Sequence, residues 1–455
     1  MATTRLYRTP GSASNQVKWT WSSWVKLGPT TAAGSNLFGS SLLCAYTDAN
    51  NYTEIAFQNS GIIDFLNVTG ASTDARITTH GMFRDPNAWY HLVFVWDTAN
   101  VTGGDRMKLY VNGDRIEGTG GIAYTEPSSS LNSIMNSTSP QEIGSRAGGS
   151  NYFNGVLAET YFADGQAYAA SVFGETDSTS GAWVAKSGPS VTFGTNGYHM
   201  KYAAGAFGTD SSGESNTMTV AGTMTTTKDT PDNNFCTMNA LDNYYAQAAL
   251  SNGMNTMVSN ASNAAWLRGS MSVTKGKWYW ETLVSGGLGS TLGIAATGPN
   301  ATSATGANNA CTYAYMGNDG TIKRSGTGTA YGATYTTGDY IGTYLDLDND
   351  KIYFSKNGTL QNSGTGYTII APGDIRDTQN QRRFSPMIGD EDGGTVYTYK
   401  TNFGNGSFGD TQLTGTTYSD AGGEGTFKYD MAGTFDGSSQ NFRALCTVNL
   451  GEYGG

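Results

Sequence analysis

The chain has 455 residues, enough for two or three domains with sizeable cores, and it combines 62 glycines with 12% aromatic residues. Its formal net charge is -11, its pI is about 4.7, and its one basic cluster is the QRR of residues 381–383. This balance argues against a surface that follows nucleic-acid phosphates, and no stretch approaches the roughly 20 apolar residues of a membrane-spanning helix.

The N-terminal residues, MATTRLYRTPGSASNQVKWTW, lack the apolar core of a secretory signal, which predicts synthesis and folding in a cytoplasm. The cysteines are too few and too scattered for a disulfide framework or a CxxC metal site. We therefore expect reduced thiols at Cys44, Cys236, Cys311 and Cys446.

Two runs of the chain share one pattern, an apolar strand followed by a short strand that ends in Asn-Gly. They are WYHLVFVWDTANVTGGDRMKLYVNG at 89–113 and YIGTYLDLDNDKIYFSKNG at 340–358. Asn-Gly tolerates the positive φ angles of two-residue hairpin turns. HLVFVW (91–96) is apolar on both faces and predicts a buried strand, whereas KWYWETLV (277–284) predicts a strand with one face less buried.

Convincing amphipathic helices are missing, because QAYAASVF (166–173) and LDNYYAQAAL (241–250) are at best short ones. The many turn formers and β-preferring residues predict an all-β chain of two antiparallel β-sandwiches joined by a Gly/Ser/Thr-rich connector.

Composition shifts predict the domain boundaries. We expect a first β-sandwich at 1–175, a connector with a flexible centre at 176–238, a second β-sandwich at 239–408, and a C-terminal docking tail at 409–455. The tail ends in NFRALCTVNL, which is apolar enough to need covering. FCTMNAL (235–241) and LCTVNL (445–450) form a small echo, for which chance and a repeated docking element are equally good explanations. The echo alone does not indicate a Cys236–Cys446 pairing.

Several segments in the first part resemble the laminin G and concanavalin A-like lectin family. They are WTWSSWVKLG (19–28), LFGS (37–40), WYHLVFVWDT (89–98), LYVNG (109–113), EIGS (142–145) and YFNGVLAETYFADGQ (152–166). The resemblance implies a two-sheet antiparallel jelly roll over residues 1–175.

The region 240–410 resembles the SPRY family. The matching segments are GKWYWE (276–281), LGIA (292–295), YGATYTTGDYIGTYLDLDNDKIYFSKNG (331–358), FSPMIG (384–389) and TNFGNGSF (401–408). The order of the two modules and the FGTDSSG and DTPDNNF connector also resemble virion-associated proteins of bacteriophages.

The sequence offers little catalytic chemistry. Concanavalin A-like folds include glycoside hydrolases, which need two carboxylates beside the scissile bond, and no Glu-x-Asp-x-x-Glu run is present. We interpret Glu159 and Glu281 as exposed strand positions and His91 as a hydrogen-bonded structural histidine. No enzymatic activity is expected.

Metal binding is also weakly indicated. The DLDND motif, with Asp346, Asp348 and Asp350, lacks the Gly and the terminal Glu of a calcium loop and predicts a hairpin turn whose carboxylates stay solvated near Lys351. GDEDGG (389–394) reads first as a loop and second as a calcium site. Laminin G-like modules often bind calcium, so the resemblance allows this ion, but the residues do not identify its ligands, and no other cofactor is expected.

Binding remains as the function, and sugar recognition needs aromatic faces with planar polar groups on loops. Because SPRY modules bind partners through loops at one end, we predict contact residues at Tyr313, Tyr315, Asn318, Asp319 and Tyr331. A core role for these tyrosines is the competing interpretation.

These observations predict a non-enzymatic phage virion protein, made without a signal peptide, that acts as an adhesin for host surface glycans. The alternative is a decoration, adaptor or fibre-docking protein that binds other virion proteins, and a remote one is a polysaccharide depolymerase. We also expect a homo-oligomer, no nucleic-acid partner and no membrane insertion.

Overall fold

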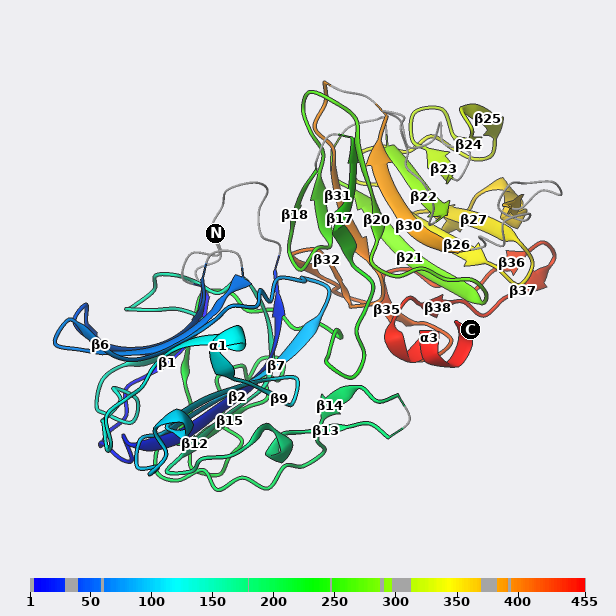
Figure 1. Ribbon diagram of the computed structural model, residues 1–455. Helices are drawn as coiled ribbons and strands as arrows, with labels where there is room; N and C mark the ends of the chain where they lie inside the picture. The colour runs from blue at the N-terminus through cyan, green and yellow to red at the C-terminus, as the bar shows by residue number, and fades with distance from the viewer. Residues whose placement is uncertain are drawn as a thin grey trace. The chain divides into compact units, whose positions relative to one another are not determined.

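The computed structural model describes residues 4–28, 40–58, 61–178, 180–245, 248–286, 290–296, 312–369, 383–391 and 394–454. The chain divides into two compact units, Met1–Thr226 and Thr227–Gly455 (Figure 1). Most of the regular structure in these residues is antiparallel β-sheet, which confirms the predicted all-β class. No helix in the described ranges is long and apolar enough to cross a membrane.

The first unit is a sandwich of two sheets. The eight-stranded sheet contains, in spatial order, β10 (Ile122–Thr125), β6 (Ser72–Thr79), β5 (Ile63–Thr69), β4 (Asn51–Phe57), β3 (Ser40–Asp48), β11 (Gln141–Ile143), β1 (Arg5–Arg8) and β16 (Thr219–Ala221). The six-stranded sheet contains β15 (Tyr198–Met200), β12 (Gly155–Asp164), β2 (Lys18–Leu27), β7 (Trp89–Asp97), β8 (Met107–Val111) and β9 (Asp114–Ile116). A separate pair joins β13 (Gly174–Thr176) to β14 (Trp183–Ala185), and the short helical turns are η2 (Gly103–Asp105), α1 (Gly118–Gly121) and η3 (Ala170–Val172).

Alternation along the strands places large apolar side chains between the two sheets. On β2, Trp19 and Trp21 point inward, and on β7 Phe94 and Trp96 do the same, where they meet Phe65 of the opposite sheet. Strand β7 is buried on both faces, as HLVFVW predicted, because residues 166–193 cover the outer face of the six-stranded sheet.

The second unit is also a two-sheet sandwich. Its seven-stranded sheet contains β17 (Met238–Tyr245), β20 (Ala265–Gly269), β30 (Phe384–Asp390), β22 (Ser290–Ala296), β23 (Thr312–Met316), β24 (Thr321–Arg324) and β25 (Thr327–Ala330). Its nine-stranded sheet contains β18 (Ala249–Ser251), β19 (Thr256–Val258), β31 (Thr398–Asn402), β21 (Lys277–Val284), β26 (Tyr340–Asp346), β27 (Lys351–Lys356) and β28 (Thr359–Leu360), with β29 (Tyr367–Thr368) paired to β27 and β38 (Arg443–Ala444) paired to β21. Smaller elements are the strand pairs β32 (Ser407–Phe408) with β33 (Thr411–Gln412), β34 (Tyr418–Ser419) with β35 (Thr426–Phe427), and β36 (Thr434–Phe435) with β37 (Ser438–Ser439), together with η5 (Asn362–Gly364) and α3 (Thr447–Tyr453).

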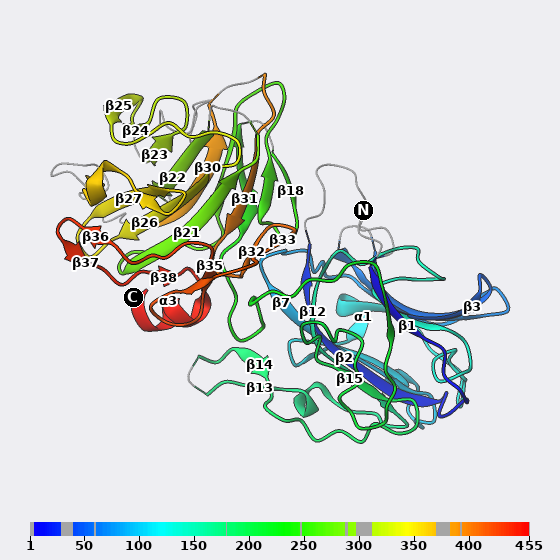
Figure 2. The ribbon, with the colours of Figure 1, turned by 180° about the vertical axis from the view of Figure 1, so that it is seen from behind.

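The C-terminal segment is part of the second unit. Phe427, Phe435 and Phe442 pack on the outward tyrosines of β21, β26 and β27. Strand β38 pairs with β21 (Figure 2). The segment predicted as a C-terminal docking tail, 409–455, therefore packs on its own unit. The aromatic residues of this segment cover the outer face of β21, so β21 is buried on both faces. The prediction that KWYWETLV has one less buried face is therefore wrong.

Most of the predicted connector at 176–238 also belongs to a folded unit in the structure. Strand β15 pairs with β12 and β16 pairs with β1, so residues up to 226 complete the first sandwich. Of the two short helices considered, 166–173 contains only the turn η3, and 241–250 contains strand residues of β17 and β18.

The echo between residues 235–241 and 445–450 joins two segments that lie side by side. Phe235 forms an antiparallel bridge with Cys446, and the Cys236 amide donates to the Leu445 carbonyl at 2.8 Å. Cys236 packs in the sandwich core, whereas Cys446 packs in the cluster on the outer face. Cys44, Cys236 and Cys446 form no disulfide, while Cys311 lies outside the described residues.

Candidate functional site

The predicted SPRY-loop contacts separate into core and surface residues. Tyr313 and Tyr315 of β23 are fully buried and Tyr331 is 7% exposed, because all three rings point into the core of the second unit. The Tyr315 hydroxyl donates to the Ala333 carbonyl. That burial withdraws the rings from any partner, so these three tyrosines are not surface contacts.

Asn318 and Asp319 do lie exposed, in the turn between β23 and β24. The Asp319 carboxylate accepts the amide and hydroxyl of Thr321 at 2.9 and 2.7 Å. The pair therefore caps a turn.

The DLDND motif forms the predicted hairpin turn, but its first carboxylate is buried and not solvated. Asp346 is fully buried, bonds the Lys277 ammonium at 2.5 Å, and accepts the amides of Asp348 and Asn349. Lys277, rather than Lys351, therefore neutralises the motif. In the described part of the chain no group of three or more His, Cys, Asp or Glu side chains could hold a metal ion, and Asp392 of the second acidic run lies outside that part.

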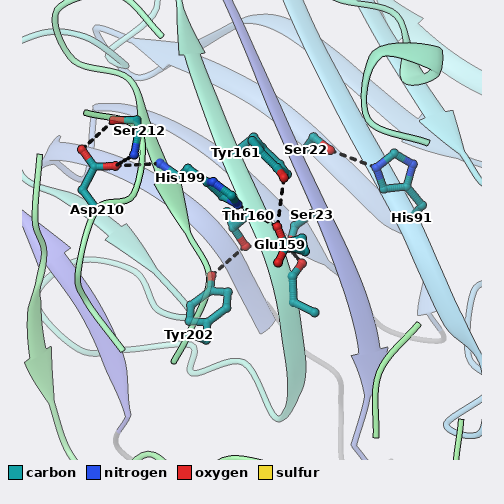
Figure 3. A network of polar contacts seen from close by, with 11 residues as sticks. Ser22, Ser23, His91, Glu159, Thr160, Tyr161, His199, Tyr202, Asp210 and Ser212 are labelled. Carbon is teal, nitrogen blue, oxygen red and sulfur yellow. Dashed lines mark hydrogen bonds and ion pairs between the residues drawn. The ribbon is translucent and has the colours of Figure 1, made fainter. Parts of the chain in front are cut away.

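A serine and a histidine meet on the outer face of the six-stranded sheet, in an arrangement like a catalytic dyad (Figure 3). The Ser22 hydroxyl lies 2.9 Å from Nε2 of the buried His91, and the Trp183 indole donates to Nδ1 at 3.0 Å. An indole N–H can only donate, so Nδ1 is unprotonated and a neutral ring carries its proton on Nε2. Burial lowers the pKa of His91 to about 3, in agreement with a neutral ring. His91 therefore donates to Ser22 and cannot accept its proton.

A second polar group in Figure 3 surrounds a bulge in β12. Glu159 has a φ of 48°, lies half-exposed, and bonds Nε2 of His199 at 2.7 Å and the Tyr161 hydroxyl at 2.9 Å. Burial raises the pKa of Glu159, but the hydrogen bonds from His199 and Tyr161 outweigh it and hold that pKa below its usual value. These contacts fix the bulge. Glu159 lies on a strand as expected, but its side chain is only partly exposed.

Glu281 differs from its predicted exposed position because the C-terminal segment covers it. Its carboxylate is fully buried and accepts the backbone amides of Lys428 and Tyr429 at 3.0 and 2.9 Å, together with the Tyr279 hydroxyl. Burial raises the pKa of Glu281, and the two amides only partly offset this. The carboxylate serves to hold the segment on the sheet.

The outer face of the eight-stranded sheet carries a row of polar side chains that the sequence did not reveal. Register places Glu54 of β4 opposite Cys44 of β3, and Cys44 opposite Glu142 of β11. The two glutamates are thus two strand spacings apart, roughly 10 Å between their backbones. A search for carboxylates along one strand cannot find a pair that three strands bring together.

Both glutamates of this row are buried and held by arginines. Arg146 bonds Glu54 at 3.2 Å and Arg5 lies 3.5 Å from Glu142, which also accepts from Ser145 and from the Gly148 amide. Burial raises the pKa of Glu54 although Arg146 opposes it. Burial also raises the pKa of the Cys44 thiol well above its usual value, so this thiol is a poor nucleophile.

Aromatic rings flank this row at the surface. Tyr46 and Tyr52 face each other in register with ring centroids 6.2 Å apart, and the Arg146 guanidinium lies 4.0 Å from the Tyr52 centroid. All three side chains are partly exposed. We call Tyr46, Tyr52, Arg146 and Glu54 the first aromatic site.

Comparison with known families decides the identity of the two units. Residues 3–172 match the concanavalin A-like lectin/glucanases superfamily, and residues 277–372 match the SPRY domain. The chain carries a concanavalin A-like domain followed by a SPRY domain. The two resemblances seen in the motifs are confirmed. Trp183 lies beyond the range that matches the concanavalin A-like superfamily, and Tyr429 lies beyond the range that matches the SPRY domain.

Relatives are similar to short parts of the chain. A 61-residue stretch is 43% identical to Ran-binding protein 10 of Danio rerio and, at the same identity and length, to Ran-binding protein 9 of Homo sapiens. These matches cover 13% of this chain and 10% and 8% of those proteins, so the chain spans a tenth or less of the relatives. Among solved structures, the SPRY domain of human HERC1 is 14% identical with a TM-score of 0.30 and covers 39% of this chain and 99% of that chain. The PSpry domain of TRIM65 is 16% identical with a TM-score of 0.28 and covers 36% of this chain and 91% of that chain.

Proposed function

We propose that the chain is a non-enzymatic bacteriophage virion protein, an adhesin that binds host surface glycans through the outer face of its concanavalin A-like domain. The observation that carries the proposal is the first aromatic site, where two partly exposed tyrosines stand on a rigid sheet beside an ion-paired guanidinium and carboxylate. Aromatic rings bind the apolar faces of sugars, and planar polar groups bind their hydroxyls.

The virion assignment is supported by the order of the modules and the connector motifs, which resemble those of virion-associated phage proteins. Many copies on one particle would let weak glycan sites act together. The charge of -11 repels acidic envelopes, so adhesion would depend on specific polar contacts or on a bridging calcium ion.

The chemistry of two groups argues against catalysis and so supports the non-enzymatic part of the proposal. His91 holds its proton toward Ser22, and each carboxylate of the Glu54–Glu142 row is bonded to an arginine and buried. A glycosidase needs one carboxyl group to give a proton and another to reach the sugar or a water. The depolymerase alternative therefore has the weakest support.

The test is binding of the full chain to host cells and to their extracted surface polysaccharide, with and without EDTA. Tyr46→Ala with Tyr52→Ala should lower binding at least tenfold, whereas Tyr110→Ala, on the other sheet of the same unit, should leave it within twofold. Loss of wild-type binding in EDTA would assign a cation to the site. Equal binding by the wild type and the double variant would refute the assignment to this face.

A second candidate function is the binding of other virion proteins, as a decoration, adaptor or fibre-docking subunit. It is favoured by the SPRY match and by the similarity to proteins named for binding Ran. An adaptor would bind particles that lack this chain and would not bind host cells, even when presented as a multimer. The same purified chain, measured on both targets and by light scattering for its oligomeric state, separates the two functions.

A further inference from the structure

The Asn-Gly turns of the two domains are built alike. In the first unit, Asn112 has φ 49° and Gly113 has φ 89°, and the Asn112 side chain accepts the amide of His91 at the start of the hairpin at 2.8 Å. The Trp183 ring covers the glycine so closely that a Cβ on Gly113 would lie 2.6 Å from it. A ring from beyond the matched family range therefore closes the turn.

The second unit repeats each part. Asn357 has φ 51° and Gly358 has φ 82°, and the Asn357 side chain accepts the amide of Tyr340 at 2.9 Å. A Cβ on Gly358 would lie 2.7 Å from the Tyr429 ring. Tyr340 and Tyr429 thus correspond to His91 and Trp183.

The two positions differ in what surrounds the rings. In the first unit, His91 is 1% exposed and lies between Trp24 and Trp183, at centroid distances of 4.9 and 6.0 Å, and it bonds the latter. In the second unit, Tyr340 and Tyr429 are only partly buried, with centroids 5.7 Å apart. The position is closed in the first domain and partly exposed in the second, where the Phe408 ring packs edge-on against Tyr340 at a centroid distance of 5.0 Å.

In the described part of the chain, a lysine that has neither an ion pair nor a side-chain hydrogen bond stands over this partly exposed position. The Lys428 ammonium lies 4.9 Å from the Tyr340 centroid and 5.6 Å from that of Tyr429. Among the described residues, no carboxylate pairs with it and no hydrogen-bond acceptor contacts it, unlike Lys400 on the same sheet face, which bonds Asp410 at 2.7 Å. Neither phenol hydroxyl has a protein partner in those ranges. Glu281 accepts the backbone amides of both Lys428 and Tyr429, which holds the backbone that carries the cation on the sheet.

We propose that Tyr340, Tyr429 and Lys428 form a second saccharide site, specific for sugars that carry a carboxylate, such as uronic acids. The carboxylate of the sugar would bond the Lys428 ammonium, and its hydroxyls would bond the phenols. The sugar ring would lie against the two tyrosines and Leu283, which pairs with Tyr340 across β21 and β26. One unpaired cation fits one negative charge per sugar. The inference deepens the proposed glycan-binding function by naming a ligand class for the second domain.

The test is calorimetric titration of the full chain with oligogalacturonide and, as a control, with its fully methyl-esterified form, which has the same rings without the charge. We expect binding of the acid form alone, weakened by added salt. Lys428→Met keeps the apolar stem and should lower affinity at least tenfold. Lys275→Met makes the same charge change at an exposed position of the same unit and should change it less than twofold.

Equal binding of the esterified sugar, or unchanged affinity of Lys428→Met, would overturn the proposal. A tetraglutamate peptide that binds as well as the oligogalacturonide would replace the saccharide with an acidic protein partner and would also overturn it. Tyr429→Phe, which keeps the ring on Gly358, should fold normally and lose part of the affinity. If the chain binds host cells but not oligogalacturonide, this site is refuted and the adhesin proposal stands. If it binds oligogalacturonide through Lys428 but does not bind cells, the adhesin proposal is refuted and this site stands.

Discussion

His91 shows how one buried base makes a domain sensitive to acid. Its pKa is about 3 in the folded chain, well below the usual value of about 6.5. Between these values the unfolded chain binds a proton that the folded chain does not, so stability is lost as pH falls through this window. The expected slope is at most about 1.4 kcal/mol per pH unit.

We therefore predict that His91→Gln lowers stability at pH 7 but reduces its dependence on pH between about 6.5 and 4. Differential scanning calorimetry of the full chain at three pH values measures both effects. His80→Gln, at an exposed position, is the control and should keep the wild-type slope. An unchanged slope in His91→Gln would mean that other groups cause the acid sensitivity.

Gly358 is needed both for its backbone and for the ring above it. Its φ of 82° costs any other residue about 1–2 kcal/mol, and a Cβ would lie 2.7 Å from Tyr429. Gly338 has a similar φ of 91° with nothing within 4 Å of its Cβ position. Chemical denaturation should show that Gly358→Ala destabilises the second unit by about 1–3 kcal/mol more than Gly338→Ala, which carries only the backbone cost. Equal losses would show that the Tyr429 ring moves aside freely.

At the scale of elements, Glu281 joins the C-terminal segment to the sheet. Glu281→Gln turns one acceptor into a donor that faces the backbone amides, so a buried hydrogen bond is replaced by a clash of donors. We expect a loss of about 1–3 kcal/mol and faster proteolysis of residues 409–440. Limited digestion followed by mass spectrometry measures the cleavage, with the exposed Glu452→Gln as control. A digestion pattern like that of the wild type would show that the aromatic contacts alone hold the segment.

The elements that the sequence predicted well are those set by local pattern. Alternation and Asn-Gly turns specify the hairpin of β7 and β8 and that of β26 and β27, and both families follow from them. The face of β21 could not be predicted, because Phe427 and Phe442 that cover it lie more than 140 residues away. The Glu54–Cys44–Glu142 row escaped for the same reason, since only register across three strands brings it together.

At the scale of the whole molecule, the folding units are longer than the family matches. The first unit needs β15 and β16, and the second needs the C-terminal aromatic residues. We predict that fragments 1–226 and 227–455 are each folded and monomeric or specifically oligomeric, whereas 239–408 exposes Tyr279, Tyr344 and Tyr353 and aggregates.

Circular dichroism, dye binding and size-exclusion chromatography of the three fragments check this. Fragment 227–455 is the matched control for 239–408, because it adds back only the missing flanks. A soluble 239–408 with a cooperative transition at the same temperature would show that the C-terminal segment is dispensable.

The antiparallel pairing of residues 234–236 with 445–447 also determines how the second unit bears load. The Thr447 amide donates to the Asn234 carbonyl at 2.9 Å, so the two chain directions leave the domain at the same end of this pair. Tension applied before Asn234 and after Thr447 breaks these bonds one after another, as in unzipping, rather than all together, as in shear. A chain pulled at these two points should therefore first yield at a low force, with the C-terminal segment peeling away before the sandwich itself is loaded.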